Sequence, residues 1–262
     1  MHMTIPYFHV CSFTSEIFKG NPTGICPLEK WIEDEKMQKI AAENNLSETA
    51  FFVKENDYFK IRYFSPIVEI DLCGHATLAS ALVLYHMYEY KNMDIQFLSN
   101  AGKLKIRKSN DLIIMNFPSY ELSEIKLPEI LLKGLNILPR EVYEANEDYM
   151  LVYKTEDEII KLQPEFSELK KSKSRGIIVT APGKEYDFVS RFFAPQVGIH
   201  EDPVTGSAHC AMSPYWSKKL NKRKLRAKQL SKRTGEIGCY YLGDRTEISG
   251  NAVFYMMGEI SL

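Results

Sequence analysis

The chain has 262 residues, of which 45% are hydrophobic and 26% charged, and its formal net charge at pH 7 is −1. This composition is that of a folded globular protein and excludes a disordered, collagen-like or low-complexity chain. The near-neutral charge excludes a protein that coats nucleic acid through a globally basic surface. The length suits one large domain or two domains of about 130 residues.

The sequence contains no targeting or membrane signal. No stretch approaches the roughly 18–20 consecutive apolar residues of a membrane-spanning helix, and the first residues lack the features of a signal peptide. The cysteines are odd in number and widely spaced, with no C-x-x-C pair, which predicts reduced thiols. They are Cys11, Cys26, Cys73, Cys210 and Cys239. We expect a cytoplasmic protein with no membrane partner.

In the first half, hydrophobic periodicity predicts short strands and two helices. The predicted strands are 6–12, 51–54, 59–64, 94–98, 103–108 and 112–117. A helix is expected over 33–44, and a second over 76–88. The second helix is apolar on most sides, so we expect it inside the protein.

The second half follows the same plan. Its predicted strands are 149–153, 176–180, 187–193, 236–242, 246–249 and 252–257, and its buried helix is 207–219. Prolines and polar residues interrupt the pattern near 118–128. We therefore expect an N-terminal domain of residues 1–118 and a C-terminal domain of residues 119–262.

An internal repeat links the two halves. Residues 59–76 and 188–208 share the pattern F-x-x-R-aromatic-F-small-P-x-V-x-I, followed by Gly and then Ala. Phe64 and Phe193 are 129 positions apart, whereas Gly74 and Gly206 are 132 apart, so the second copy carries three extra residues. The repeat predicts a duplicated α+β fold, in which each half is a shell of strands around a central helix.

Gly74 and Gly206 each precede a predicted buried helix. The unpaired N–H groups at a helix start bind anions, and a glycine lets a ligand approach the backbone closely. If a pseudo-twofold axis relates the halves, the two helix starts would hold a substrate carboxylate between them. Taken singly, each glycine is equally consistent with a turn.

Four further residues are candidates for acid/base chemistry. His75 titrates near neutral pH and could relay a proton, or it could simply pack at a helix start. Asp202 and Ser207 precede the second helix, where both residue types are also common caps. Glu48 lies between a predicted helix and the apolar segment 50–53, and the alternative for it is a surface acid in a loop.

Three segments carry a resemblance to a known family. Residues 45–51 (NLSETAF), 73–79 (CGHATLA) and 198–209 (GIHEDPVTGSAH) resemble the phenazine-biosynthesis isomerase (PhzF-like) family. The similarity extends from Tyr7-Phe8-His9-Val10 and Gly20-Asn21-Pro22 to Gly250-Asn251-Ala252-Val253, nearly the whole chain. One departure is Thr234, which stands where the family usually has a glycine.

The resemblance implies a diaminopimelate-epimerase-like fold of two pseudo-twofold-related halves, each a mostly antiparallel β-barrel around a helix. It implies a cofactor-independent isomerase, without a metal, that is commonly a homodimer. The residues that it assigns are Glu48 as the catalytic acid/base, His75, Asp202 and Ser207 in support, and Gly74 and Gly206 at the substrate carboxylate. The substrate itself stays open.

Two other functions are weighed against this one. The resemblance implies that racemases of this fold use two bases, with a cysteine before each glycine. In this chain the repeat position equivalent to Cys73 is Thr205, and a hydroxyl is a far weaker acid than a thiol. A binding module could use the nine Lys and Arg of 218–233, although that run is equally a solvated helix end and loop.

The segment 200–209 contains potential metal ligands without the spacing of a metal site, so we expect no metal there. They are His200, Glu201, Asp202 and His209.

Overall fold

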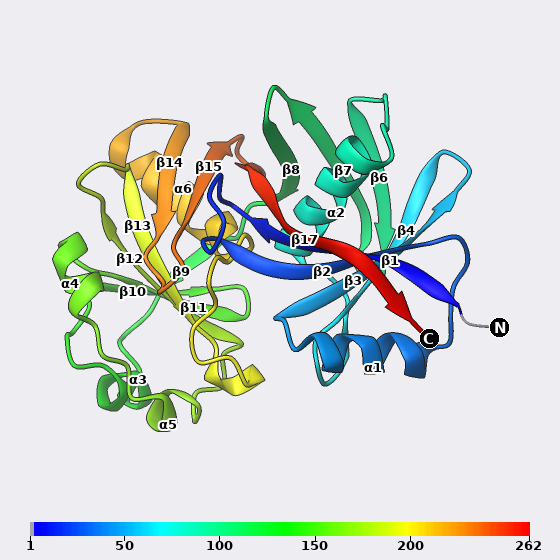
Figure 1. Cartoon of the computed structure of the whole chain (residues 1–262). Coiled ribbons are helices and arrows are strands. Elements are labelled where there is room, and N and C mark those ends of the chain that lie inside the picture. Colours follow the sequence, from blue (N-terminus) through cyan, green and yellow to red (C-terminus); the bar gives the residue numbers. More distant parts are fainter. Residues whose placement is uncertain (1–2) are drawn as a thin grey trace. The chain divides into compact units, whose positions relative to one another are not determined.

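The computed structural model describes residues 3–262, which divide into two compact units (Figure 1). The first unit runs to Asn116 and also contains Ser249–Leu262, and the second is Phe117–Ile248. The expected C-terminal domain of 119–262 is therefore corrected at its end. Strand β17 (Ala252–Ser261) pairs with β1 (Thr4–Ser12) along its whole length, so its backbone hydrogen bonds belong to the first unit.

The first unit is built from a mostly antiparallel set of strands. Besides β1 and β17 these are β2 (Asn21–Leu28), β3 (Glu48–Glu55), β4 (Tyr58–Phe64), β5 (Glu69–Ile70), β6 (Asp94–Ser99), β7 (Gly102–Ser109) and β8 (Leu112–Pro118). They pair in the order β17-β1-β2-β3-β4-β6-β7-β8, with β5 at the end of β4, and only β2–β3 and β4–β6 are parallel. Parallel strands need a crossover, and helices α1 (Asp34–Asn44) and α2 (Gly74–Met87) provide the two crossovers.

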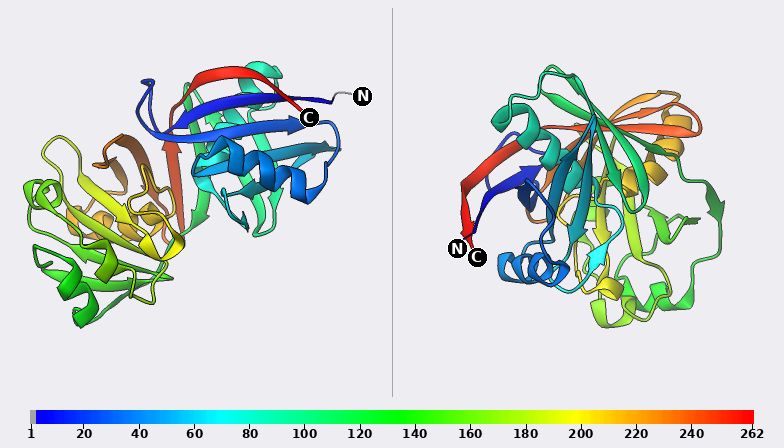
Figure 2. Two further views of the ribbon diagram at one scale, coloured as in Figure 1. Left: turned by 60° about the horizontal axis from the view of Figure 1, so that its bottom comes forward. Right: turned by 90° about the vertical axis from the view of Figure 1, so that its right-hand side faces the viewer.

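The predicted internal helix of the first unit is confirmed. Every side chain from His75 to Leu84 is buried, and α2 packs against β1, β2, β3 and β17. Helix α1 instead presents one face to the strands through Met37, Ile40 and Ala41 and lies along their outside, as the views in Figure 2 also show.

The second unit has its own set of strands and helices. The strands are β9 (Leu122–Glu124), β10 (Glu141–Ala145), β11 (Asp148–Val152), β12 (Gly176–Pro182), β13 (Phe188–Phe193), β14 (Lys224–Gln229) and β15 (Gly235–Tyr241), followed by β16 (Arg245–Gly250). The helices are α3 (Glu129–Gly134), α4 (Glu156–Lys161), α5 (Phe166–Leu169), the 3₁₀ turn η1 (Pro195–Val197) and α6 (Ala208–Leu220). The strands pair in the order β9-β10-β11-β12-β13-β14-β15, and only β11–β12 and β13–β14 are parallel.

The two units therefore repeat one topology. The first crossover carries α1 in the first unit and the short helices α4 and α5 in the second. The second crossover carries the long buried helix, α2 or α6, between strands that pair in parallel. Helix α6 is buried over most of its length, as α2 is. The α+β fold of duplicated, mostly antiparallel halves around a helix is the one that the sequence predicted.

Strand β14 corrects the expectation that residues 218–233 form only a helix end and a loop. Leu225, Ala227 and Gln229 are buried while Lys224 and Arg226 are exposed, which is the alternation of a strand with one face in the core. Strand β2 was also missed, because it contains Pro22 and Pro27, which usually argue against a central strand. Within residues 3–262, no helix combines the length and hydrophobicity needed to cross a bilayer.

Candidate functional site

Glu48 is placed by the connection between α1 and β3. Asn45 ends α1 in the left-handed region (φ 48°), and the chain then turns into β3, whose first residue is Glu48. The parallel partner strand fixes this residue, because Thr23 Oγ1 donates a hydrogen bond of 2.8 Å to the Glu48 carbonyl. The side chain of Glu48 is only 12% exposed, so it is not the surface acid of the alternative interpretation.

His75 lies beside Glu48, at the start of α2. Its Nε2 is 3.0 Å from Glu48 Oε2, and its Nδ1 is 3.3 Å from Asn21 Nδ2 and 3.4 Å from Cys73 Sγ. Ser12 Oγ donates a bond of 2.7 Å to the His75 carbonyl and so ties the helix start to β1. Glu48 and His75, which are 27 positions apart in the sequence, thus form one buried pair next to Gly74.

The charges of this cluster favour a protonated His75 and a neutral Cys73. Burial alone would lower the pKa of His75, but the hydrogen bond to Cys73 and the charge and hydrogen bond of the Glu48 carboxylate outweigh it and hold the pKa well above 6.5. Burial, together with the Glu48 charge, raises the pKa of Cys73 to about 11. At neutral pH the thiol therefore keeps its proton, which makes it a poor base.

In the second unit, Asp202 stabilises the turn that leads into α6. Thr205 Oγ1 donates a bond of 2.5 Å to Asp202 Oδ2, and Gln229 bonds both the Thr205 N–H (2.9 Å) and the Asp202 carbonyl (2.8 Å). Gln229 is the last residue of β14, the strand that the sequence analysis missed. The turn is thus fixed from two sides before Gly206 is reached.

Ser207 occupies the N-cap position of α6, but its side chain makes no capping bond. Arg175 instead donates a bond of 3.3 Å to Ser207 Oγ and forms a two-bond ion pair with Asp148, whose side chain is 1% exposed. The capping interpretation of Ser207 is therefore wrong. Arg175 precedes β12 and Asp148 begins β11, and nothing in the spacing of the sequence indicated that the two would meet.

The predicted site residues thus fall into two groups. Glu48, Gly74 and His75 come together in the first unit, and Asp202, Gly206 and Ser207 flank the start of α6 in the second. The residues missed by sequence reasoning act as partners of these groups: Asn21, Arg175, Asp148 and Gln229. Only Asn21 had a signal, since Gly20-Asn21-Pro22 is part of the family resemblance.

The histidine and acids of the segment 200–209 do not converge. His200 stacks on Phe166 with ring centroids 4.5 Å apart, Glu201 is ion-paired with Arg191, and His209 is fully buried in α6. In the part of the chain that the structure describes, the one group of three potential metal ligands is Glu48, Cys73 and His75.

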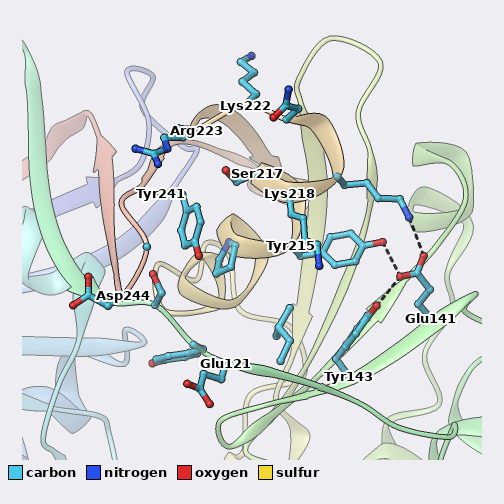
Figure 3. A pocket seen from close by; sticks show the side chains of 17 residues that line it. Glu121, Glu141, Tyr143, Tyr215, Ser217, Lys218, Lys222, Arg223, Tyr241 and Asp244 are labelled. Carbon is cyan, nitrogen blue, oxygen red and sulfur yellow. Dashed lines mark hydrogen bonds and ion pairs between the residues drawn. The ribbon is translucent and has the colours of Figure 1, made fainter.

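A large pocket of about 1260 Å³ lies elsewhere in the second unit, at the end of α6 (Figure 3). Part of the basic run lines it, including Lys218 and Arg223. Its acid Glu141 accepts hydrogen bonds from the hydroxyls of Tyr143 and Tyr215, as the dashed lines in Figure 3 show. None of the predicted site residues lines this pocket.

Comparison with known proteins covers nearly the same part of the chain as the resemblance. A family model described as phenazine biosynthesis-like protein (PhzC-PhzF) matches residues 10–258. The chain belongs to the PhzC-PhzF family. A Pseudomonas aeruginosa protein named as an uncharacterized isomerase is 44% identical over 260 residues, covering 99% of this chain and 100% of that protein. Family membership therefore supports an isomerase.

Known structures of similar proteins agree with this assignment. A crystal structure of a PhzF-family protein from Enterococcus faecalis matches with a TM-score of 0.97 and 43% identity, covering 99% of this chain and 100% of that one. A hydroxyproline epimerase from Agrobacterium vitis matches with a TM-score of 0.65 at 7% identity, over 99% and 93% of the two chains. The second match shows a common fold only.

Proposed function

We propose that this PhzF-family protein is an isomerase that moves a proton on a small carboxylated metabolite, with Glu48 as general base and then general acid. The observation that carries the proposal is the buried Glu48–His75 pair, 3.0 Å apart at the start of α2. A carboxylate that is buried, next to a proton donor and beside a helix start has the features of an acid/base site.

In this mechanism Glu48 takes a proton from an acidic carbon of the substrate and returns it at another carbon. His75, protonated at neutral pH, holds the carboxylate in position and offsets its charge before the transfer. Because the same carboxyl group removes and returns the proton, the enzyme ends the cycle unchanged. The reaction needs no second base.

The backbone at the start of α2 is the proposed binding site for the substrate carboxylate. The N-cap residue Cys73 forms no side-chain capping bond, and this supports a role for the N–H groups near Gly74 in binding an anion and the negative charge that develops in the transition state. By the repeat, we assign the same role to Gly206 before α6. Asp202 and Ser207 are proposed to orient the substrate and to hold or relay protons.

The test is incorporation of solvent deuterium. Wild type, Glu48→Gln and the control Glu55→Gln are incubated in D₂O with cyclic and acyclic unsaturated amino and hydroxy acids, and products are read by NMR and mass spectrometry. Glu55 is on the same strand but pairs with Lys60 near the surface, so it is a matched control. We expect Glu48→Gln to lower turnover by about 10²–10⁴-fold, the usual contribution of a positioned acid/base. Full activity of Glu48→Gln would overturn the proposal.

Racemisation by two bases is the nearest competing function, since the hydroxyproline epimerase shares the fold. Such a mechanism would use Cys73 and the residue at the equivalent position, Thr205. The Thr205 hydroxyl donates to Asp202 at 2.5 Å, and a hydroxyl is far too weak an acid to replace a thiol. A Cys73→Ala variant separates the two functions. The two-base mechanism requires turnover to fall by the 10²–10⁴-fold typical of a missing base, whereas the one-carboxyl mechanism requires a much smaller loss of turnover.

A further inference from the structure

Cys73 has no role in a mechanism with one carboxyl group, yet it lies inside the Glu48–His75 cluster. Its Sγ is 3.4 Å from Nδ1 and 3.7 Å from Nε2 of His75. One ligand atom each from Glu48, Cys73 and His75 lies within 4.8 Å of the other two, and no other such group of His, Cys, Asp or Glu occurs in residues 3–262. The sequence did not indicate this trio, because Glu48 is remote from Cys73-Gly74-His75.

The spacing of these atoms is close to that of a tetrahedral metal site. Around zinc, with ligand distances near 2.0–2.3 Å, neighbouring N, O and S atoms lie about 3.3–3.7 Å apart. Here Nε2 is 3.0 Å from Glu48 Oε2 and 3.7 Å from Cys73 Sγ, and the sulfur lies within 4.8 Å of the carboxylate, so side-chain rotations would have to close that third distance. Asn21 contacts the other ring nitrogen, Nδ1, and leaves Nε2 as the atom that faces Glu48.

The carboxylate oxygen of the trio also has unused capacity. Glu48 Oε2 is buried, and among residues 3–262 no donor makes a well-aligned hydrogen bond to it, although His75 Nε2 is close. In the free protein the protonated His75 lies beside this oxygen, and once Nε2 gives up its proton a metal cation would take over the same position next to the carboxylate. The mixture of one S, one N and one O ligand selects a thiophilic divalent ion such as Zn²⁺ over Mg²⁺ or Ca²⁺.

We propose that Glu48, Cys73 and His75 form an inhibitory site for a thiophilic divalent cation, with Zn²⁺ as the best match. On binding, the ion bonds to Sγ, Nε2 and one carboxylate oxygen, while the thiol proton and the Nε2 proton pass to solvent. The fourth position is left for water or for a substrate carboxylate. Glu48 is then engaged by the metal and can no longer accept a proton from carbon. The inhibition, unlike the binding, rests on the function proposed above.

The test measures metal binding directly, without substrate. Purified wild type is titrated with Co²⁺, whose thiolate bond gives a near-ultraviolet charge-transfer band, and Zn²⁺ affinity is then measured by calorimetry. The matched variants are Cys73→Ala and Cys26→Ala, since Cys26 is likewise buried in the first unit. A thermal melt of each variant is recorded to check that the variant is folded. Glu48→Gln is the second ligand variant.

We expect one equivalent of metal and a thiolate–cobalt band in wild type and Cys26→Ala. Cys73→Ala should lose the band and at least about 100-fold in Zn²⁺ affinity, because loss of a ligand exceeds the 10–100-fold effect of outer residues. Glu48→Gln should keep the band and bind at least about tenfold more weakly. A wild type without the band, or equal Zn²⁺ affinity in wild type and Cys73→Ala, would overturn the proposal. Neither result depends on isomerase activity, so failure here is distinct from failure of the proposed function.

Discussion

The starts of α2 and α6 occupy equivalent places in the repeat but carry different chemistry. Cys73-Gly74-His75 begins α2, and Thr205-Gly206-Ser207 leads into α6. At the first, a histidine meets a carboxylate and a thiol. At the second, a serine meets Arg175, and a threonine meets Asp202. In the proposed function the first site transfers the proton, whereas the second offers the Arg175 guanidinium and hydrogen bonds.

One backbone contact has been kept although its side chain changed. Thr77 Oγ1 donates to the Cys73 carbonyl at 2.7 Å, and His209 Nδ1 bonds the Thr205 carbonyl at 2.9 Å, four residues back in both cases. A hydroxyl and an imidazole at equivalent positions thus both form a hydrogen bond with the carbonyl group four residues earlier. The two helix starts therefore share a backbone arrangement, whereas the side chains around them differ.

The acid of the first unit has no counterpart in the second. Phe64 of β4 pairs with Thr49, and the equivalent Phe193 of β13 pairs with Ile177. The position matching Glu48 is therefore Gly176, the residue after Arg175. An isomerase with a single acid/base carboxyl, rather than two symmetric bases, is what this asymmetry favours.

The Arg175–Asp148 ion pair of the second unit should make the largest contribution to stability. Replacing Arg175 with Leu leaves the buried Asp148 carboxylate without its cation, and we expect a loss of about 3 kcal/mol in the free energy of unfolding. Urea unfolding at pH 7 measures the loss. Replacing both residues, as Arg175→Leu with Asp148→Asn, should recover much of it, and a double variant as unstable as the single one would contradict the explanation.

The two buried histidines should respond to pH with opposite signs. Burial lowers the pKa of His209 to about 4, against a smaller opposing effect of its bond to Thr205, so the folded state resists protonation there. The stability that neutral His209 contributes is present above pH 6.5 and lost as the pH falls towards 4, by about 3 kcal/mol in total. His75, whose pKa is raised, contributes stability that is present below pH 6.5 and lost as the pH rises through its folded value.

Thermal melts of His209→Gln and His75→Gln across pH 4–8 test these signs. The stability of wild type relative to His209→Gln should fall as the pH is lowered from about 6.5 to 4. Relative to His75→Gln it should rise as the pH is lowered from 8 to about 6.5 and then stay level down to pH 4. Parallel curves for the two variants would show that the histidines are not in the different environments described.

Ser207→Ala should have the smallest effect on folding. Because Ser207 makes no capping bond, we expect a change within about 0.5 kcal/mol, against about 1 kcal/mol for Thr155→Ala, where a capping box is present. Denaturant unfolding of both variants checks this contrast. If Ser207→Ala were as destabilising as Thr155→Ala, the serine would be a helix cap after all.

The duplication, the two internal helices and most of the strands can be predicted from the order of the residues alone. Apolar residues on every side of 76–84 require burial, and the repeated F-x-x-R pattern places equivalent strands in both halves. The site motifs were also readable, because Glu48, His75, Asp202 and Ser207 lie in short family-specific segments. Periodicity missed β2, β10 and β14, and in β2 and β14 prolines and lysines obscured strands that neighbouring strands hold in place.

Which side chains contact one another depends on the folded arrangement of the strands and helices. Strand β17 joins the first unit because its hydrogen bonds go to β1, which local alternation cannot show. The contacts of Glu48 with His75, and of Arg175 with Asp148, each link residues 27 positions apart. The pairing of β11 with β12 creates the second contact, and the first needs both the pairing of β2 with β3 and the placement of the start of α2. Sequence patterns report the preferences of neighbouring residues, whereas the charge and protonation of a buried group depend on whatever the fold brings to within a few ångströms.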